Sequence, residues 1–489
     1  MNIDMRLPRR AKILLLTGVL LIGILAGCSP ASEAPSAQAY FEDGFNASRR
    51  SDWQAAILAF DSGLALESNN SAALAARGRA KLSLAQYDAA LVDFNSALTL
   101  DPEDGSAFSG RGETHLKLGN DDAAIQDLTR AIEFSPLRYD NYIDRGLAYY
   151  HKQQYDPAIK DFTRGIRCNA RTTRGYYNRG LASLKTQQYE QAIADFTQVL
   201  QDNPDSLGAL RRRVEAYKAI GQFDLARADL AKILTVTPED PIVVVMQAEL
   251  DYAQKDYENA VVAYTKAIEL KPDNLDYYYR RGKSEYHTKL YDQAIADFTH
   301  IIEIDPASAR AYRQRGLAQY RLKQYDPAKS DLNLAVGLNN QDATSVLYLG
   351  LIAADEKQET TAMGYFNRRL ELLPDDPTAL YERGRLYYNL KRYGSAKTDF
   401  ETLIQVDPEN PKAYYNLGLT FYKFRAYKDA VEQFTRAIAL DPTNEWMFYY
   451  RGRAYLYLRN KELANADFQH VIDMAPGSKA AELAQGKLR

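Results

Sequence analysis

The sequence predicts an all-α fold made of tandem helix pairs, and three observations lead to this prediction. First, one pattern of small, aromatic and turn residues recurs every 34 residues along most of the 489-residue chain. Second, apolar residues within each repeat recur three and four positions apart, a spacing typical of amphipathic helices. Third, a break in the middle of each repeat, and a proline near the end of ten of the thirteen repeats, separate successive helices.

Residues 275–308 show the layout of one repeat most clearly. A first amphipathic helix containing Tyr286 precedes a predicted turn at 289–292. A second helix containing Phe298 follows and is expected to end before Pro306. The repeat is therefore predicted to be a helix–turn–helix unit.

Small residues keep a constant place in the repeat. Stepping by 34 from Gly282 meets glycine in eleven of thirteen repeats, and stepping from Ala294 meets alanine in all thirteen. Small side chains are needed where two helix backbones approach closely. We number the predicted repeats 1 to 13 within 37–478: 37–70, 71–104, 105–138, 139–172, 173–206, 207–240, 241–274, 275–308, 309–342, 343–376, 377–410, 411–444 and 445–478.

A helix pair of this period, with Gly, Ala, a large apolar residue and Pro at these spacings, resembles the tetratricopeptide repeat family. The resemblance implies a right-handed superhelical solenoid in which the first helix of each pair lines a concave groove. Stacking of neighbouring repeats supplies the core, because one repeat buries too little surface to be stable alone. Residues 479–489 look like a shortened first helix and are expected to cap the last repeat.

The N-terminal segment has a different composition. Four basic residues among the first twelve precede an apolar run over 13–26, and Leu-Ala-Gly-Cys ends at Cys28. This pattern predicts a signal peptide over 1–27, too short to span a bilayer permanently. The last four residues also resemble a bacterial lipobox, which implies that Cys28 carries diacylglycerol and a further acyl chain such as palmitate, with 28–36 as a tether.

An ordinary signal peptide that happens to contain a cysteine is the alternative. With the lipid, the mature chain is expected to be held at the membrane by its N-terminus alone and to face the periplasm. Ser29 after the cysteine resembles the pattern sorted to the outer membrane, where the organism has one. Cys168 is the only other cysteine, so no internal disulfide is expected in the mature chain.

Two charged positions of the repeat vary together. Nine repeats carry Arg just before the glycine position and Asp sixteen residues later, as in Arg281 with Asp297 and Arg315 with Asp331. The other four repeats, numbers 1, 7, 10 and 12, carry neither residue. We therefore predict an ion pair between the two helices of each of these nine repeats, with a structural role. Inheritance of both residues through duplication, without contact, is the alternative.

Residue patterns typical of catalysis are missing from the sequence. The five histidines have no second metal ligand at helical spacing, and no glycine-rich phosphate loop follows a strand. We therefore expect that the protein is not an enzyme and that it binds neither a cofactor nor a metal ion. The 64 acidic and 61 basic residues give a formal net charge of -3, which provides no electrostatic reason to expect nucleic acid as a partner.

In the family, the second, fifth, sixth, ninth, twelfth and thirteenth positions of each repeat face the groove. Here they hold 17 Lys or Arg, nine Asp or Glu, and 14 Tyr, so the groove is expected to be basic and rich in tyrosine. No other pair of adjacent repeats combines as many groove cations with as many groove tyrosines as repeats 8 and 9. Their predicted partner-binding residues are Tyr279, Arg280, Lys283, Tyr286, Arg310, Arg313, Tyr320 and Arg321.

The sequence therefore favours a non-catalytic protein–protein interaction scaffold of the bacterial cell envelope. Its basic groove is expected to bind extended, acidic segments of other envelope proteins. One alternative is a protein that binds envelope glycan or polymer, because tyrosine rings also stack on sugars. Another is an accessory subunit of an envelope enzyme or a secretion complex. The sequence leaves the oligomeric state open, a homo-oligomer included.

Overall fold

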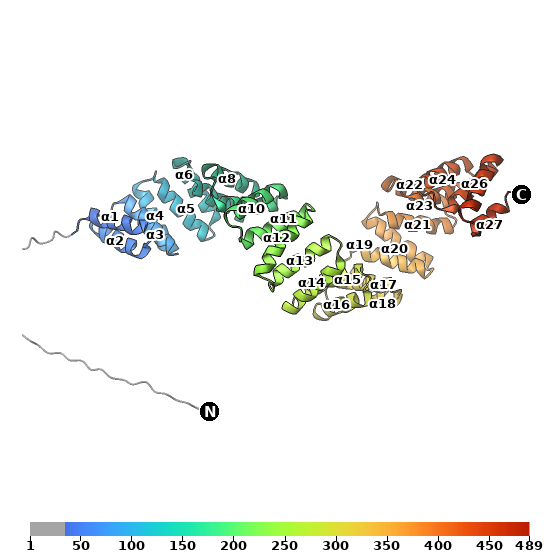
Figure 1. The fold of residues 1–489 in the computed structure, drawn as a ribbon, viewed down its shortest axis with the longest axis horizontal. Coiled ribbons are helices and arrows are strands. Elements are labelled where there is room, and N and C mark those ends of the chain that lie inside the picture. The colour runs from blue at the N-terminus through green and yellow to red at the C-terminus, as the bar shows by residue number, and fades with distance from the viewer. Residues whose placement is uncertain (1–34, 489) are drawn as a thin grey trace, which may run out of the picture. The chain divides into compact units, whose positions relative to one another are not determined.

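The computed structural model describes residues 35–488, which form 27 helices and no strand (Figure 1). The predicted all-α fold class is confirmed. The predicted signal peptide, Cys28 and nearly all of the predicted tether lie outside the described residues.

The helices occur in thirteen consecutive pairs followed by one short helix, α27 (Lys479–Gln485). The first helices of the pairs are α1 (Ala37–Arg49), α3 (Ser71–Ser83), α5 (Gly105–Lys117), α7 (Tyr139–His151), α9 (Thr173–Lys185), α11 (Leu207–Ala219), α13 (Pro241–Ala253), α15 (Leu275–His287), α17 (Ala309–Arg321), α19 (Ala343–Asp355), α21 (Pro377–Asn389), α23 (Pro411–Lys423) and α25 (Glu445–Tyr457). The second helices are α2 (Trp53–Leu66), α4 (Tyr87–Leu100), α6 (Asp121–Phe134), α8 (Tyr155–Cys168), α10 (Tyr189–Asp202), α12 (Phe223–Val236), α14 (Tyr257–Leu270), α16 (Tyr291–Ile304), α18 (Tyr325–Leu338), α20 (Glu359–Leu372), α22 (Tyr393–Val406), α24 (Tyr427–Leu440) and α26 (Lys461–Met474).

Local chemistry at the turns explains where the helices begin and end. The residue before nearly every first helix is Ser, Thr, Asn or Asp, whose side chain can accept a hydrogen bond from an N–H group of the first turn. Asn274, for example, accepts from the backbone N–H of Asp276 at 3.0 Å. Between α15 and α16, Lys289 adopts a left-handed conformation with φ of 64°, which ends α15 and reverses the chain.

Each repeat buries the same small and large side chains between its two helices. All thirteen alanines at the Ala294 position are 0% exposed, and Phe298 is equally buried. A Cβ atom added to Gly282 would lie 2.9 Å from ring carbons of Phe298, closer than carbon atoms can pack. The phenylalanine ring therefore occupies the space that glycine leaves open, as the repeat pattern predicts.

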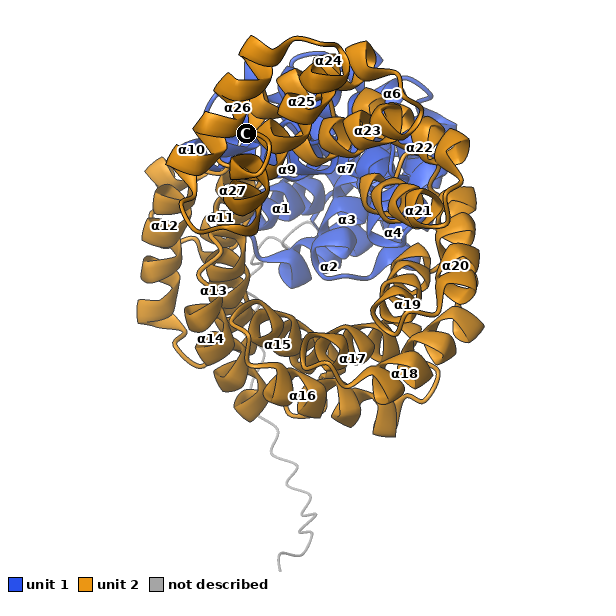
Figure 2. Cartoon of the chain, turned by 90° about the vertical axis from the view of Figure 1, so that its right-hand side faces the viewer, with its two compact units in different colours: residues 1–198 blue, residues 199–489 orange. Residues whose placement is uncertain are grey.

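The chain divides into two compact units, residues 1–198 and 199–489, with the division inside α10. In the second unit, shown in orange in Figure 2, α13, α15, α17 and α19 line the inner side of a curved row, and α14, α16, α18 and α20 form its outer side. At the end of this unit, α27 packs against the last pair through Ala480, Ala481 and Ala484. We call the two sides of each repeat the first-helix face and the second-helix face.

Candidate partner-binding surface

The nine arginines that pair with aspartates in the sequence contact those aspartates in the structure. Arg281 donates from Nε to Asp297 Oδ2 at 2.9 Å and from Nη2 to Asp297 Oδ1 at 2.7 Å. Arg315 holds Asp331 in the same way, at 2.7 and 2.8 Å. The remaining pairs are Arg77–Asp93, Arg111–Asp127, Arg145–Asp161, Arg179–Asp195, Arg213–Asp229, Arg383–Asp399 and Arg451–Asp467.

The same guanidinium groups also reach the preceding repeat, which the sequence-based prediction did not include. Arg281 Nη1 donates to Thr265 Oγ1 of α14 at 3.2 Å. Equivalent contacts in other repeats are Arg77–Asp61, Arg111–Asn95, Arg145–Thr129, Arg179–Thr163, Arg315–Thr299, Arg383–Asn367 and Arg451–Thr435. Each of these arginines therefore joins three helices, two of its own repeat and one of the repeat before it.

Burial makes this arrangement energetically important. Asp297 is only 5% exposed, and the Arg281 guanidinium lies over the ring of Tyr278 at 5.6 Å. The hydrogen bonds to Asp297 raise the pKa of Arg281, so its guanidinium is charged at neutral pH. A two-pronged arginine–carboxylate contact fixes geometry as well as energy. Removing only one partner would leave a buried charge unpaired, which is usually more costly than removing both.

Repeat 8 adds a third acidic group to its pair. Glu285 of α15 is 5% exposed and lies 3.7 Å from Arg281 Nε, and its Oε2 atom has no hydrogen-bond partner among the described residues. Burial, followed by repulsion from Asp297, raises the pKa of Glu285 to about 7. The next repeat has Gln319 at this position, equally buried and uncharged. Glu285 is therefore a strained carboxyl group beside the pair that holds repeat 8 together.

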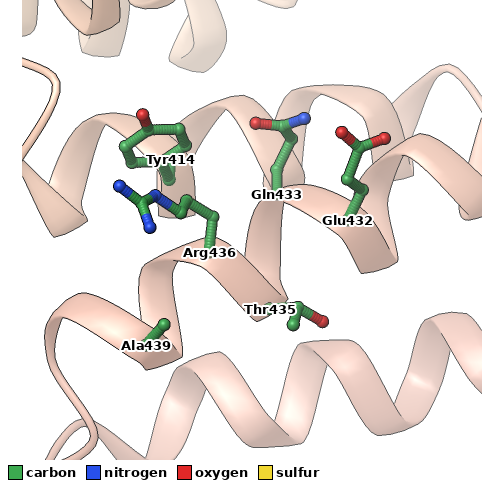
Figure 3. A pocket seen from close by; sticks show the side chains of 6 residues that line it. All are labelled: Tyr414, Glu432, Gln433, Thr435, Arg436 and Ala439. Atoms are coloured by element: carbon green, nitrogen blue, oxygen red, sulfur yellow. The ribbon is translucent and has the colours of Figure 1, made fainter.

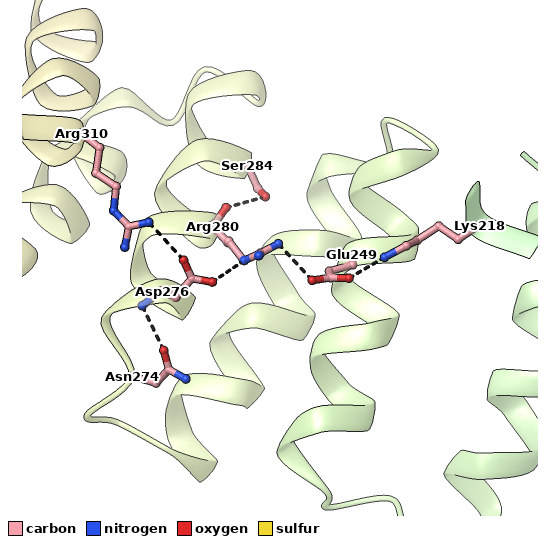
Figure 4. Close-up of polar contacts among 7 residues, drawn as sticks. All are labelled: Lys218, Glu249, Asn274, Asp276, Arg280, Ser284 and Arg310. Atoms are coloured by element: carbon pink, nitrogen blue, oxygen red, sulfur yellow. Dashed lines mark hydrogen bonds and ion pairs between the residues drawn. The ribbon is translucent and has the colours of Figure 1, made fainter. Parts of the chain in front are cut away.

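The predicted basic groove residues do not form a free positive surface. Glu249 of α13 accepts from Lys218 Nζ at 2.5 Å and from Arg280 Nη1 at 3.0 Å (Figure 4). Arg280 Nε also donates to Asp276 Oδ2 at 2.6 Å, and Asp276 lies 3.5 Å from Arg310 Nη1. Charges of alternating sign thus run across the first helices of four repeats.

Arg313 is neutralised in a similar way. Its Nη1 atom lies 3.3 Å from Asp342, a buried residue that caps α19. The acids that neutralise these arginines therefore lie in three repeats: Glu249 in repeat 7, Asp276 in repeat 8 and Asp342 at the end of repeat 9.

Two other predicted cations differ, because aromatic rings hold them. Lys283 Nζ lies 5.2 Å from the centre of the Tyr252 ring, and Arg321 Nε donates to Tyr286 Oη at 2.8 Å. The hydrogen bond to Tyr286 raises the pKa of Arg321. No carboxylate lies within ion-pair distance of Lys283 or Arg321 among the described residues. These two side chains carry the positive charge that is open to an outside partner.

The predicted groove tyrosines also pack within the fold. The ring of Tyr286 meets Tyr291 edge to face at 5.5 Å, and Tyr279 meets Phe298 at 6.0 Å. Tyr320 lies 6.0 Å from Tyr325, and burial raises its pKa to about 12. All three groove rings remain half-buried, so each contributes one edge to the first-helix face while its other side contacts a neighbouring helix.

Two residues of repeat 7 belong to this surface but were not predicted. Glu249 and Tyr252 occupy the ninth and twelfth positions of their repeat, where the family pattern already places groove residues. The prediction selected pairs of repeats by their number of groove cations. Repeat 7 contributes an acid and a single tyrosine, so Glu249 and Tyr252 were left out. A comparison of charges across neighbouring repeats would have found both.

The helix pairs, their period and their packing define a class of tandem helical-repeat proteins, and sequence comparison gives the family. Models described as tetratricopeptide repeat match residues 75–139, 143–206, 183–250, 275–308, 309–342, 349–414 and 411–444, and one described as TPR repeat matches 248–288. The chain belongs to the tetratricopeptide repeat family.

Solved structures with a similar fold include the APC/C hetero-tetramer Cut9-Hcn1, at 14% identity over 93% of this chain and 96% of that chain, with a TM-score of 0.40. YrrB, a TPR protein with an unusual peptide-binding site, is 21% identical over 39% of this chain and 97% of its own, with a TM-score of 0.36. The pilF protein of Pseudomonas aeruginosa is 18% identical over 44% and 97%, with a TM-score of 0.40. No curated protein matches the chain.

Arrays of this family are protein–protein interaction scaffolds and generally are not catalytic. Within residues 35–488, no group of three or more His, Cys, Asp and Glu side chains is placed to hold a metal ion. The described helices also include none that is long and apolar enough to cross a membrane.

The strained Glu285 carboxyl gives a pH-dependent prediction. Its pKa rises from 4.5 in the unfolded chain to about 7 in the folded chain, so its ionisation costs more free energy in the folded state. The free energy of unfolding therefore falls progressively as the pH rises from 4.5 to 7. Glu285→Gln removes this loss. The variant should be more stable than the wild type at pH 8 by roughly 1–3 kcal/mol and nearly equal to it at pH 4, as measured by urea unfolding.

The matched control is Gln319→Glu in repeat 9, which should create the same loss of stability between pH 4.5 and 7. If the free energy of unfolding depends on pH in the same way for the wild type and Glu285→Gln, the assignment of this pH dependence to Glu285 is contradicted.

Proposed function

We propose that this chain is a non-catalytic scaffold of the bacterial cell envelope that binds an extended, acidic segment of a partner protein on the first-helix face of repeats 7 to 9. The single observation that supports this proposal most is that Lys283 and Arg321 are held by tyrosine rings instead of carboxylates. A carboxylate from a partner can pair with each of them without displacing an acid of the chain.

The neighbouring aromatic rings suit the backbone of such a segment. Tyr252 and Tyr286 are each fixed by a second ring, Tyr257 and Tyr291, at 5.2 and 5.5 Å. Rings that are already ordered lose little conformational entropy on binding, and their hydroxyl groups can hydrogen-bond to a peptide. The charges steer the acidic segment toward the surface, and the rings supply contact area.

The proposal is tested with the partner recovered by pulldown from solubilised envelopes. Lys283→Ala combined with Arg321→Ala should weaken binding at least about tenfold, which corresponds to ~1.4 kcal/mol, and should reduce its dependence on salt. Arg280 and Arg313 are less suitable targets, because replacing them also breaks ion pairs within the fold.

The matched control removes two positive charges from the exposed side of α8, with Lys160→Ala and Arg167→Ala, and should leave the affinity unchanged. Equal affinity of the Lys283/Arg321 variant and the wild type, at unchanged helical content, would place the site elsewhere. Recovery of a cell-wall polymer instead of a protein would favour the glycan-binding alternative.

We further propose that the mature chain begins at Cys28 and is held at the membrane by lipid on that residue. The basic, apolar and Leu-Ala-Gly-Cys segments in sequence order support this proposal. The Cys28→Ala variant should leave the membrane fraction with its helical content intact. Retention of that variant in membranes after a high-salt wash would contradict lipid anchoring.

A further inference from the structure

The repeats without the arginine–aspartate pair differ on the second-helix face. Repeat 7 has lost all three members of the arrangement seen in repeat 8: Gln247 stands at the arginine position, and Ala263 stands at the aspartate position. Ala231 of the preceding repeat stands where Thr265 accepts the third contact. Smaller and mostly apolar side chains therefore replace a guanidinium and its partners at this one place.

A cavity of about 440 Å³ lies at this place, between α12, α13 and α14. Its walls include both replacement residues, Gln247 and Ala263. Repeat 12 also lacks the pair, with Leu417 and Gln433 in its place, and a second cavity of about 430 Å³ includes Gln433 in its lining (Figure 3). Residues at four equivalent repeat positions line both cavities, namely Val244 and Tyr414, Val262 and Glu432, Ala263 and Gln433, and Lys266 and Arg436.

The two cavities differ in the side chains that line them. In repeat 12, the Arg436 guanidinium lies 5.8 Å from the centre of the Tyr414 ring, and Glu432 and Gln433 add polar groups (Figure 3). In repeat 7, the equivalent positions are Val244 and Lys266, so no ring lines the cavity, and its one arginine, Arg227, comes from α12. The repeat 7 cavity is therefore the more apolar of the two.

Apolar side chains form one side of the repeat 7 cavity: Leu234, Pro238, Val244, Val262 and Ala263. Val262 is 67% exposed, so this wall presents apolar surface to the solvent. An exposed apolar wall beside a side-chain-sized cavity is typical of an anchor pocket at a protein interface.

Two charged groups at the cavity differ, because Asp251 is paired within the described part of the chain and Lys266 is not. Asp251 at its base is 2% exposed, accepts two hydrogen bonds of 2.8 Å from Gln247 Nε2, and lies 3.1 Å from Arg227 Nη2, so its charge is already balanced. Lys266 at the rim is exposed and forms no ion pair within the described residues. The rim therefore favours a negative charge next to the apolar group.

We propose that this cavity is a second docking site, which takes one apolar side chain of a partner protein together with a neighbouring acidic residue that pairs with Lys266. The site is lined from α12, α13 and α14, shares no residue with the surface proposed above, and does not depend on that function. Where Arg and Asp are missing from repeat 7 and Thr from the repeat before it, a pocket lies between helices that still form their pairs.

The direct test restores the missing residues. Gln247→Arg, Ala263→Asp and Ala231→Thr together rebuild the arrangement of repeat 8, which fills the cavity with the side chains that other repeats use for stability. The probe is 8-anilinonaphthalene-1-sulfonate, which joins apolar rings to an anionic group and fluoresces in apolar sites. The wild type should bind it, and the restored variant should bind at least tenfold more weakly while its thermal unfolding midpoint does not fall.

The matched control restores the pair in repeat 12, with Leu417→Arg and Gln433→Asp, and should keep the affinity for the probe. Acetyl-Glu-Leu-amide should displace the probe from the wild type better than acetyl-Lys-Leu-amide at equal concentration, and Lys266→Ala should remove that preference. Unchanged probe affinity in the restored repeat 7 variant, with intact helical content, would overturn the proposal. Probe binding that falls as the protein concentration rises would overturn the assignment to a partner protein and give the cavity to a second copy of the chain.

Discussion

The rest of the array depends on one interaction, in which a single arginine side chain joins its own helix to two others. In repeat 8, Arg281 holds Asp297 of its own second helix and Thr265 of the preceding second helix. Neighbouring repeats of a solenoid touch mainly each other, so their interface determines how far order extends along the chain. The bidentate contact to Asp297 fixes the helix pair, and the hydrogen bond to Thr265 ties that pair to the preceding repeat.

This constraint also explains how the two faces of the array differ. The pair occupies the space between first and second helices, which leaves the first-helix face to charged and aromatic residues that vary among repeats. On that face, Glu249 and Asp276 neutralise Arg280, whereas Lys283 and Arg321 rest on tyrosine rings. In repeat 7, which lacks the pair, a cavity lies between α12, α13 and α14.

The sequence was sufficient to predict the helix pairs, since Gly282, Ala294 and Phe298 recur at fixed spacing and meet in the core. Joint occurrence of Arg and Asp was sufficient to identify the ion pair within each repeat. The third contact, to Thr265, was missed although Thr, Asn or Asp precedes the arginine by a constant sixteen residues in these repeats. The charge of the groove was overestimated because Glu249 belongs to the preceding repeat and Asp342, at the last position of repeat 9, lies outside the groove positions that were counted.

The most direct test of this account is a pair of double-mutant cycles on one arginine. Arg281→Ala is combined with Asp297→Ala in one cycle and with Thr265→Val in the other, and free energies of unfolding are measured by urea denaturation. The account predicts coupling of about 1–2 kcal/mol to Asp297 and about 0.5–1 kcal/mol to Thr265. In each cycle, the stability lost in the double variant is compared with the sum of the losses in the two single variants. Agreement within about 0.3 kcal/mol in both cycles would contradict the claim that this guanidinium joins the repeats.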